Sequence, residues 1–258
     1  MSNKVWLIGG TSDSATIANI LAKSEISSII TVTTNSAKTL YKSSAEIVIG
    51  CLNQDAMGSF CQRNSIKAVI DASHPYATEV SQQAIAVTTQ LKIPYLRYER
   101  ENRHWTSKND ANVIELDSFD CLLTGNYLRN KRVLLTVGCK VLPRFRPWQN
   151  QATLFARVLP KLKSLETAIA AGFTSDRLIA IRPPLSASTE TALWQQWQIS
   201  LVITKASGKA GGEELKRQVA ARLGIPLIVI ARPQISYPLQ TSEIEEVLAF
   251  CHSIALTP

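Results

Sequence analysis

Three polar segments of this 258-residue chain each follow a short apolar run and carry groups that bind anions or move protons. The first, Gly9-Gly10-Thr11-Ser12, lies between an apolar run and a helix-like segment. Glycines in that position let a phosphate approach backbone N–H groups at a helix N-terminus. We therefore expect Gly9, Gly10, Thr11 and Ser12 to bind cofactor phosphates. The pattern is not G-x-G-x-x-G, and Asp13 also fits an ordinary helix cap.

The second segment, Asp71-Ala72-Ser73-His74-Pro75-Tyr76-Ala77, places a carboxylate, an imidazole and a phenol after an apolar run. Open parallel sheets hold their ligands at the ends of such strands. His74 and Tyr76 are the groups best placed to deliver a proton, and Asp71 and Ser73 are candidates for substrate contact. The alternative is that Asp71 and Ser73 cap the next helix while His74 packs. Water or a carboxyl group of the substrate remains an alternative proton source.

The third segment, Thr204 to Gly212, combines lysines with flexible glycines between an apolar run and a helix-like segment. This arrangement predicts a second anion-binding loop, with Lys205, Ser207 and Gly208 as candidate contacts. The spacing is not that of a Walker A motif. A plain surface turn would also explain the glycines.

A basic window from Cys121 to Leu165 contains nine Lys or Arg residues and no Asp or Glu. The whole chain has a net charge of +8, so the window's +9 leaves −1 for the rest. Such a surplus indicates a polyanionic ligand, or a basic face that aids solubility. The basic residues are Arg129, Lys131, Arg132, Lys140, Arg144, Arg146, Arg157, Lys161 and Lys163. We expect Lys140 and Arg157 to bind such an anionic ligand, with Lys216 and Arg232 further along the chain as weaker candidates.

Several classes of protein are disfavoured. The five cysteines are widely spaced with no C-x-x-C pair, and His74, His104 and His252 form no metal-ligand spacing, so we expect no metal site. The cysteine usage predicts a reducing, cytoplasmic location. The apolar runs are too short for a membrane span, and the basic window lacks the interleaved aromatics of a nucleic-acid stacking platform. Hydrolase motifs are absent from the sequence.

Short β-branched runs alternate with amphipathic segments along the chain, which predicts α/β architecture with parallel sheets. We expect strands near 5–8, 28–32, 46–49, 68–70, 94–96, 132–137, 154–158, 178–181, 201–204 and 227–230. Helices are expected near 13–23, 53–64, 76–91, 164–171, 188–196, 211–223 and 242–254. The two series indicate an N-terminal domain over 1–129 and a C-terminal domain over 130–258.

The segment after the second expected strand contains Thr33, Thr34, Asn35, Ser36 and Lys38, with no acidic residue for a ribose 2′-hydroxyl. This favours a dinucleotide with a 2′-phosphate, and hence NADPH. Ser36 and Lys38 are the candidate contacts for that phosphate.

In this order the segments resemble the precorrin-6A reductase family of corrin biosynthesis, including its cobalt-precorrin-6A reductases. The resemblance spans nearly the whole chain. It rests on the glycine run, the Asp71 to Ala77 run, Ala156-Arg157-Val158-Leu159-Pro160, the Thr204 to Gly212 run, and Leu223-Gly224-Ile225-Pro226 leading to Arg232-Pro233. The His-Pro-Tyr-Ala piece is the most specific.

The resemblance implies two Rossmann-like domains with a ligand cleft between them. It also implies NADPH-dependent reduction of one double bond in a polycarboxylate tetrapyrrole, within cobalamin biosynthesis. Transient contact with neighbouring corrin-pathway enzymes is a further expectation. Alternatives are a cofactor-free, two-domain enzyme of the uroporphyrinogen synthase type and a non-catalytic dinucleotide- or nucleic-acid-binding protein. The sequence leaves open whether the substrate carries cobalt, which face of the nicotinamide is used, and the oligomeric state.

Overall fold

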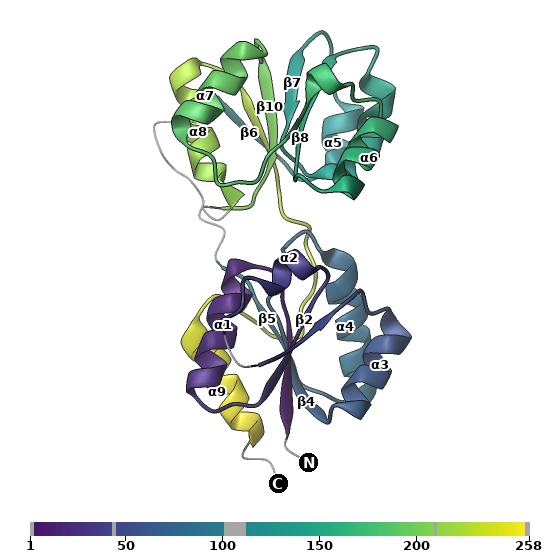
Figure 1. The fold of residues 1–258 in the computed structure, drawn as a ribbon, viewed down its shortest axis with the longest axis vertical. Helices are drawn as coiled ribbons and strands as arrows, with labels where there is room; N and C mark the ends of the chain where they lie inside the picture. The colour runs from purple at the N-terminus through teal and green to yellow at the C-terminus, as the bar shows by residue number, and fades with distance from the viewer. Residues whose placement is uncertain (1–2, 43–44, 101–111, 209–210, 256–258) are drawn as a thin grey trace. The chain divides into compact units, whose positions relative to one another are not determined.

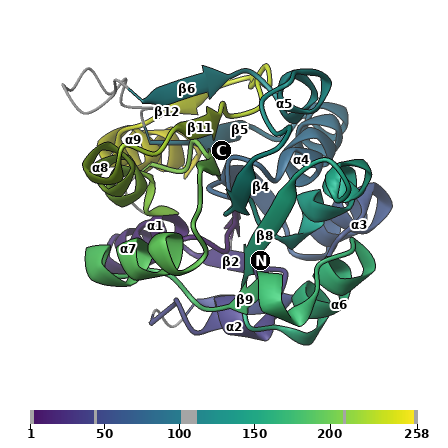
Figure 2. The ribbon, with the colours of Figure 1, turned by 90° about the horizontal axis from the view of Figure 1, so that it is seen from above.

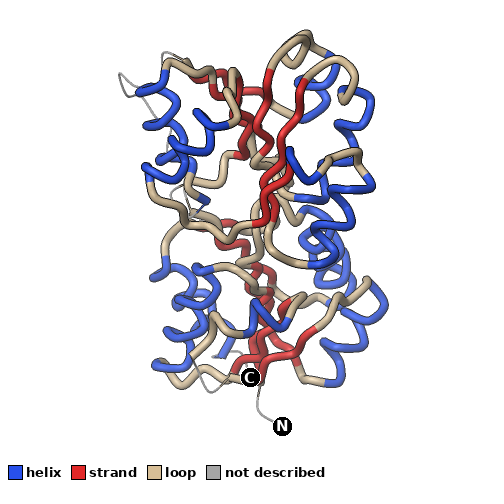
Figure 3. The backbone as a smooth tube through the Cα atoms, turned by 45° about the horizontal axis from the view of Figure 1, so that its top comes forward, coloured by secondary structure: helices blue, strands red, loops and turns tan. Residues whose placement is uncertain are grey.

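The computed structural model describes residues 3–42, 45–100, 112–208 and 211–255. The chain divides into two compact units. The first unit spans residues 1–101 and 234–258, and the second spans residues 102–233. In each unit the strands form a central layer with helices on both sides (Figure 3). This arrangement confirms the expected α/β class.

The first unit is built on a six-stranded parallel sheet in the order β12-β5-β4-β1-β2-β3. Its strands are β1 (Lys4–Ile8), β2 (Ser28–Val32), β3 (Glu46–Ile49), β4 (Ile66–Asp71), β5 (Tyr95–Tyr98) and β12 (Gln240–Thr241). Its helices are α1 (Ser12–Lys23), α2 (Asn35–Lys38), α3 (Gln54–Arg63), α4 (Thr78–Leu91) and α9 (Ile244–Ala255). Helices α1 and α9 cover one face of the sheet, and α3 and α4 cover the other (Figure 1).

The central strands of this sheet are apolar because both of their faces are covered. Val5, Trp6, Leu7 and Ile8 of β1 are all buried, and they alternate between two core clusters. Helix α1 begins at a capping box, in which the Thr11 hydroxyl accepts the Ser14 N–H and the Ser14 hydroxyl accepts the Thr11 N–H. The cap therefore fixes where the chain turns from strand β1 into α1.

The second unit has a six-stranded parallel sheet in the order β6-β11-β10-β7-β8-β9, with β6 and β9 at its edges (Figure 2). Its strands are β6 (Val113–Leu116), β7 (Arg132–Leu135), β8 (Thr153–Val158), β9 (Leu178–Ala180), β10 (Leu201–Lys205) and β11 (Leu227–Ile230). Its helices are α5 (Phe119–Thr124), α6 (Leu162–Ala170), α7 (Ala187–Gln196), α8 (Glu213–Leu223) and the 3₁₀ helices η2 (Cys139–Trp148) and η3 (Ser175–Arg177). The α7–α8 pair packs on one face, and α5, η2 and α6 pack on the other.

The division of the chain differs from the expected boundary near residue 130 in two ways. Strand β6 and helix α5 precede that boundary but belong to the second unit, because β6 pairs with β11. The C-terminal segment returns to the first unit, where β12 pairs with β5 and Val247 and Cys251 of α9 enter the same core as α1. The expectation of a single crossing between two contiguous domains is therefore wrong.

Candidate active site

The order of strands in the first sheet reverses between β1 and β4. The chain passes outward from β1 to β2 and β3, then returns to place β4 on the other side of β1. Connections leave the two central strands in opposite directions at such a point, so a crevice forms at their carboxyl ends. Ile8, the last residue of β1, pairs in register with Asp71, the last residue of β4. The glycine run and the Asp71 to Ala77 run are therefore neighbours.

The glycine run uses most of its own N–H groups within the protein. Gly9 N–H donates to the Thr31 carbonyl at 2.9 Å, and Gly10 N–H donates to the Tyr41 hydroxyl at 2.7 Å. Thr11 N–H donates to the Ser14 hydroxyl at 3.0 Å. The expectation that these three N–H groups bind phosphate is therefore not supported.

Groups for a phosphate remain at the start of α1. Ser12 and Asp13 occupy the first two helical positions, whose N–H groups have no carbonyl one turn earlier to meet. Ser12 is exposed, and Gly10 has φ +107° with open space where a Cβ would lie. The loop thus offers a ligand the Ser12 and Asp13 N–H groups, the Ser12 hydroxyl and an uncrowded surface at Gly10.

The segment expected to meet a 2′-phosphate forms the short helix α2. The Thr34 hydroxyl caps it, lying 3.3 Å from the Ala37 nitrogen and 3.1 Å from the Ser36 hydroxyl. Ser36 is half-buried and Lys38 is exposed. Both candidate residues therefore lie on one short turn that follows β2.

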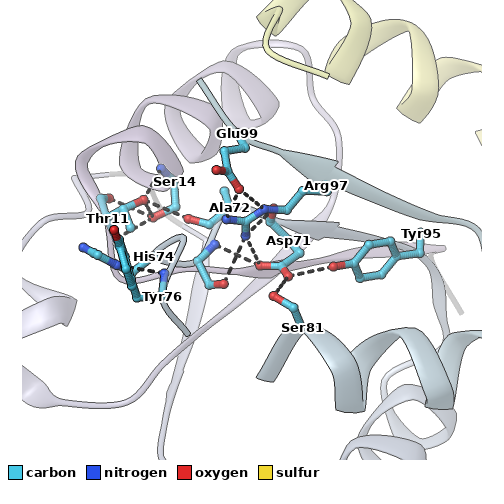
Figure 4. Close-up of polar contacts among 11 residues, drawn as sticks. Thr11, Ser14, Asp71, Ala72, His74, Tyr76, Ser81, Tyr95, Arg97 and Glu99 are labelled. Carbon is cyan, nitrogen blue, oxygen red and sulfur yellow. Dashed lines mark hydrogen bonds and ion pairs between the residues drawn. The ribbon is translucent and has the colours of Figure 1, made fainter. Parts of the chain in front are cut away.

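One side chain joins the two loops of the crevice (Figure 4). The Thr11 hydroxyl donates to the Ala72 carbonyl at 2.8 Å, while it accepts the Ser14 N–H at 3.0 Å. The Thr11 side chain that caps α1 therefore also links the start of this helix to the loop that carries His74.

The Asp71 carboxylate is fully buried, with no exposed surface. It accepts hydrogen bonds from the Ser81 hydroxyl at 2.6 Å, the Tyr95 hydroxyl at 2.7 Å, the Ser73 N–H at 2.9 Å and Arg97 Nη1 at 3.0 Å (Figure 4). Four donors saturate the acceptor capacity of a carboxylate. Asp71 is therefore a structural group beneath the loop, and its expected contact with substrate is wrong.

Arg97 lies beneath the same loop and is 1% exposed. Its guanidinium bridges two carboxylates, with Nη1 3.0 Å from Asp71 and Nη2 2.8 Å from Glu99. Nη1 also donates to the Ser73 hydroxyl at 3.2 Å, and Ser73 is itself buried. Burial alone would lower the pKa of Arg97, but Asp71, Tyr237 and Glu99 together raise it. Ser73 is thus oriented by a permanent cation, and its burial argues against the expected contact with substrate.

His74 and Tyr76 lie at the surface of this loop, which the buried Asp71 and Arg97 hold from beneath by hydrogen bonds. His74 is exposed and Tyr76 is half-buried, with ring centroids 5.8 Å apart. The Tyr76 N–H donates to His74 Nδ1 at 3.2 Å. Because Nδ1 accepts, the hydrogen of the neutral imidazole resides on Nε2. The local fold thus presents Nε2–H as the proton-bearing atom.

The second sheet contains its own reversal of strand order, between β7 and β10. Lys205 ends β10, and Gly138, Cys139 and Lys140 follow β7. Burial lowers the pKa of Lys205 from 10.5 to about 8, with Cys139 opposing and Lys140 adding to that shift. Lys205 Nζ lies 5.9 Å from the centre of the Phe119 ring. The structure therefore brings two expected anion-binding residues, Lys140 and Lys205, close enough for the charge of one to affect the other.

The loop after β10 is shaped by two residues of α8. Glu213 accepts the Gly208 N–H at 2.9 Å, and Lys216 Nζ donates to the Gly211 and Gly212 carbonyls at 3.0 Å each. Lys216 is 2% exposed, and burial followed by the charge of Arg157 lowers its pKa to about 8. Lys216 is therefore a support of the loop, and its expected contact with substrate is wrong. Lys209, the other lysine of the run, lies outside the described residues.

Other candidates of the second unit have protein partners. Arg157 Nη1 pairs with Glu190 at 2.5 Å, with 9% and 3% of the two side chains exposed. Glu190 also accepts the Trp194 Nε1–H at 3.1 Å. Arg232 Nε donates to the Ala206 carbonyl at 3.0 Å and remains half-buried beside the loop. Arg157 is thus committed to a mostly buried ion pair, which contradicts its expected place at the centre of a carboxylate clamp.

The basic window does not form one continuous face. Arg129, Lys131 and Arg132 are at the amino end of β7, whereas Lys140 follows its carboxyl end. Arg132 stacks on Phe155, and Arg144 pairs with Asp120. Lack of acidic residues in the sequence therefore does not translate into a single anion-binding surface.

The described part of the chain contains no cluster of three or more His, Cys, Asp or Glu side chains able to hold a metal ion. His104 lies outside that part. No helix within the described ranges has the length and apolar character needed to cross a bilayer.

The structure adds functional residues that sequence patterns did not indicate. Tyr41 holds the glycine run, Arg97 and Glu99 hold the His74 loop, and Glu213 holds the loop after β10. Tyr41, Arg97 and Glu213 act on partners at least five residues away in sequence, whereas Glu99 acts through Arg97, two residues before it. Only Glu213 and Glu99 are close enough to their partners to be recognised as local contacts.

Two parallel α/β units, each with polar loops at a reversal of strand order, define a Rossmann-like ligand-binding protein. Residues 4–252 match the model of the precorrin-6x reductase CbiJ/CobK family, and the chain belongs to this family.

Named relatives support the assignment along the whole chain. The chain is 45% identical over 249 residues to a cobalt-precorrin-6A reductase of Synechocystis sp., covering 96% of this chain and 95% of that protein. It is 33% identical to a cobalt-precorrin-6A reductase of Priestia megaterium, covering 95% and 96%. The solved structure of a CobK precorrin-6A reductase has the same fold, with a TM-score of 0.79, 22% identity and coverage of 100% and 99%.

Proposed function

We propose that this protein reduces one carbon–carbon double bond in the macrocycle of cobalt-precorrin-6A, using NADPH, in cobalamin biosynthesis. The observation that carries the proposal is the pairing of two loops at the β1/β4 reversal, one with a helix N-terminus and one with His74 and Tyr76. Family membership supplies the reaction class. The cobalt form is favoured because relatives of that name are up to 45% identical, whereas those named for precorrin-6A are 23% and 25% identical.

The first unit fits the cofactor. The Ser12 and Asp13 N–H groups lie in the first turn of α1, at its positive end, where an anion is stabilised. No acidic residue lies between Thr33 and Lys42, so a 2′-phosphate near Ser36 and Lys38 would meet no repulsion from this segment. These features support NADPH over NADH.

The residues of the His74 loop would complete the reaction. When bound, NADPH would supply the hydride for one carbon of the double bond, and the other carbon would take one proton, which balances the dihydro product against NADP⁺. The Tyr76 hydroxyl and His74 are the groups of the loop that can release this proton, and His74 would do so from Nε2 in its imidazolium form. The buried Asp71 and Arg97 hold these groups in place without reacting themselves.

The second unit would hold the carboxylates that rim such a tetrapyrrole. Lys140, Lys205, Ser207 and Arg232, with the backbone near Gly208, surround the β7/β10 reversal and its loop. A partly buried ammonium binds a carboxylate more strongly than a solvated one does, because water screens it less. Arg157 would serve this site indirectly, through the charge of the cluster that supports the loop.

We further propose a cytoplasmic enzyme that meets neighbouring corrin-pathway enzymes transiently. Its five cysteines are all unpaired thiols, which suits a reducing compartment.

The experiment is an anaerobic assay of NADPH oxidation with cobalt-precorrin-6A and metal-free precorrin-6A supplied separately. We expect oxidation that depends on the tetrapyrrole and is faster with the cobalt form, and slower oxidation of NADH. Absence of turnover with both tetrapyrroles, in a preparation that binds NADPH, would refute the proposed reaction. Faster turnover of the metal-free form would refute only the substrate assignment.

A further inference from the structure

Tyr41 lies three residues beyond α2 and reaches the glycine run from the protein interior. It is 9% exposed and belongs to the core cluster shared by α1 and β1. Its hydroxyl accepts the Gly10 N–H at 2.7 Å and lies 2.6 Å from the Ser14 hydroxyl. Because the Ser14 hydroxyl donates to the Thr11 carbonyl at 2.8 Å, the Tyr41 hydroxyl is the donor to Ser14. The Tyr41 hydroxyl therefore hydrogen-bonds to Gly10 and to Ser14, on the two sides of the turn between β1 and α1.

Tyr41 also explains why residue 9 is glycine. A Cβ on Gly9 would lie 2.1 Å from the Tyr41 hydroxyl oxygen, well inside van der Waals contact. The adjacent Gly10 has open space at the corresponding position. The two glycines therefore have different roles, since Gly9 makes room for Tyr41 and Gly10 leaves room for a ligand.

The same tyrosine is fastened to the helix that carries the candidate 2′-phosphate residues. Tyr41 N–H donates to the Lys38 carbonyl at 3.1 Å, and Leu40 N–H donates to the Ala37 carbonyl at 3.2 Å. These bonds continue the turn of α2 up to the tyrosine. The rigid phenol thus connects Lys38 and Ser36 to the glycine run through one residue.

We propose that Tyr41 is a positioning residue that sets the spacing between the 2′-phosphate contacts on α2 and the phosphate-binding start of α1. It thereby strengthens the preference for NADPH over NADH. A ligand held at both ends gains affinity only if the two ends are pre-organised at the right separation. NADH lacks the 2′-phosphate and uses only one of the two contacts. This inference rests on the proposed use of NADPH.

The test is calorimetric titration of the full chain and its Tyr41→Phe variant with NADPH and with NADH. We expect the variant to raise the Kd for NADPH about three- to tenfold, a change in binding free energy about that of one hydrogen bond, because the 2′-phosphate contact is held less firmly. The Kd for NADH should change less than about twofold by the same conversion. In a Lys38→Ala background the Tyr41→Phe change should have little further effect on NADPH, because the contact that it positions is already lost.

Thr88→Val is the matched control. It also removes a buried hydroxyl from the first unit, one that donates to the Ala84 carbonyl at 2.7 Å within α4. We expect a comparable loss of thermal stability and no change in either cofactor's Kd. Equal weakening of NADPH and NADH in Tyr41→Phe would overturn the inference, as would wild-type affinity for NADPH. Failure of the wild-type protein to bind NADPH would instead refute the proposed cofactor, and this inference with it.

Discussion

The hydroxyl of Thr11 donates a 2.8 Å hydrogen bond to the carbonyl of Ala72, and this bond links two loops that are 61 residues apart in sequence. One loop begins helix α1, and the other carries His74. The candidate cofactor and proton-donor groups are therefore held in one rigid frame. Reactions that transfer a hydride depend on such a frame, because the reacting atoms must be held at contact distance.

Loss of the Thr11 hydroxyl should disturb both loops. Thr11→Val removes the cap of α1 and the bond to Ala72, so we expect the free energy of unfolding to fall by about 1–2 kcal/mol. The KM for NADPH should rise in the same variant. Thr11→Ser keeps the hydroxyl and should retain both properties. Denaturant unfolding and steady-state kinetics measure the two effects. Equal behaviour of the Val and Ser variants would show that the hydroxyl is not the tie.

The buried carboxylate of Asp71 should be important for stability. In Asp71→Asn, Arg97 keeps Glu99 but loses one charged partner, so we expect a loss of about 3 kcal/mol, the lower end of the range for breaking a buried pair. Tyr95→Phe removes only one donor to Asp71 and should cost about 1–2 kcal/mol. Burial and the charge of Asp71 raise the pKa of Tyr95, so its phenol stays a donor throughout the working pH range.

Urea unfolding measures these losses, with Asp55→Asn as the control. Asp55 is exposed in the first turn of α3, so Asp55→Asn should lower the free energy of unfolding by less than about 1 kcal/mol. If Asp71→Asn cost no more than the control, Asp71 would not be the hub of the network.

The two nitrogen atoms of His74 can be separated by substitution. His74→Asn keeps an acceptor near the position of Nδ1, and so keeps the bond from the Tyr76 N–H, but it has no group at Nε2. If the imidazolium form of His74 delivers the proton from Nε2, kcat should fall about 100-fold, within the range for general acid catalysis. The Kd for NADPH should be unchanged. A normal kcat in this variant, with a lowered one in Tyr76→Phe, would assign the proton to the tyrosine.

Lys205 should make substrate affinity depend on pH. Burial lowers its pKa to about 8, so the ammonium that attracts a carboxylate is lost as the pH rises through that value. The KM for the tetrapyrrole should therefore rise above pH 8, by at most about tenfold per pH unit. Lys205→Arg remains charged and should flatten the profile.

The effect of Lys205 on folding has the opposite sign. Its folded pKa of about 8 lies below the usual 10.5, so between these values the unfolded chain holds the proton that the folded chain has lost. The contribution of Lys205 to the free energy of unfolding therefore becomes more favourable as the pH rises.

A KM profile identical in wild type and Lys205→Arg would remove Lys205 from the substrate site.

Regular periodicity made most of the fold predictable. The apolar run ending at Ile8 and the amphipathic segment from Ser12 gave β1 and α1 correctly, and Gly224, with φ +66°, ends α8 as expected. Strand β6 was missed because Ile114 and Glu115 are exposed at the sheet edge, so the segment has no continuous apolar run. The return of α9 to the first unit was missed because helical periodicity does not identify the sheet on which a helix packs.

The candidate site was predictable only as a set of loops. Residue type and position after a strand identified Thr11, His74 and Lys205, whose loops the structure gathers at reversals of strand order. The roles of Asp71 and Arg157 were misjudged because their partners Arg97 and Glu190 are 26 and 33 residues away in sequence. The sequence pattern is the same whether a charged side chain at a strand end faces a ligand or a buried counter-charge.

The most direct test of the account follows a labelled hydride. NADPH carrying deuterium at the transferable position is supplied with cobalt-precorrin-6A in ordinary water, and the product is examined by mass spectrometry. Hydride transfer from NADPH predicts a product that contains one deuterium from the cofactor and, in the converse experiment with unlabelled NADPH in heavy water, one non-exchangeable deuterium from the solvent. Reduced product without deuterium from labelled NADPH, after both faces of the nicotinamide have been labelled in turn, would contradict hydride transfer from this cofactor.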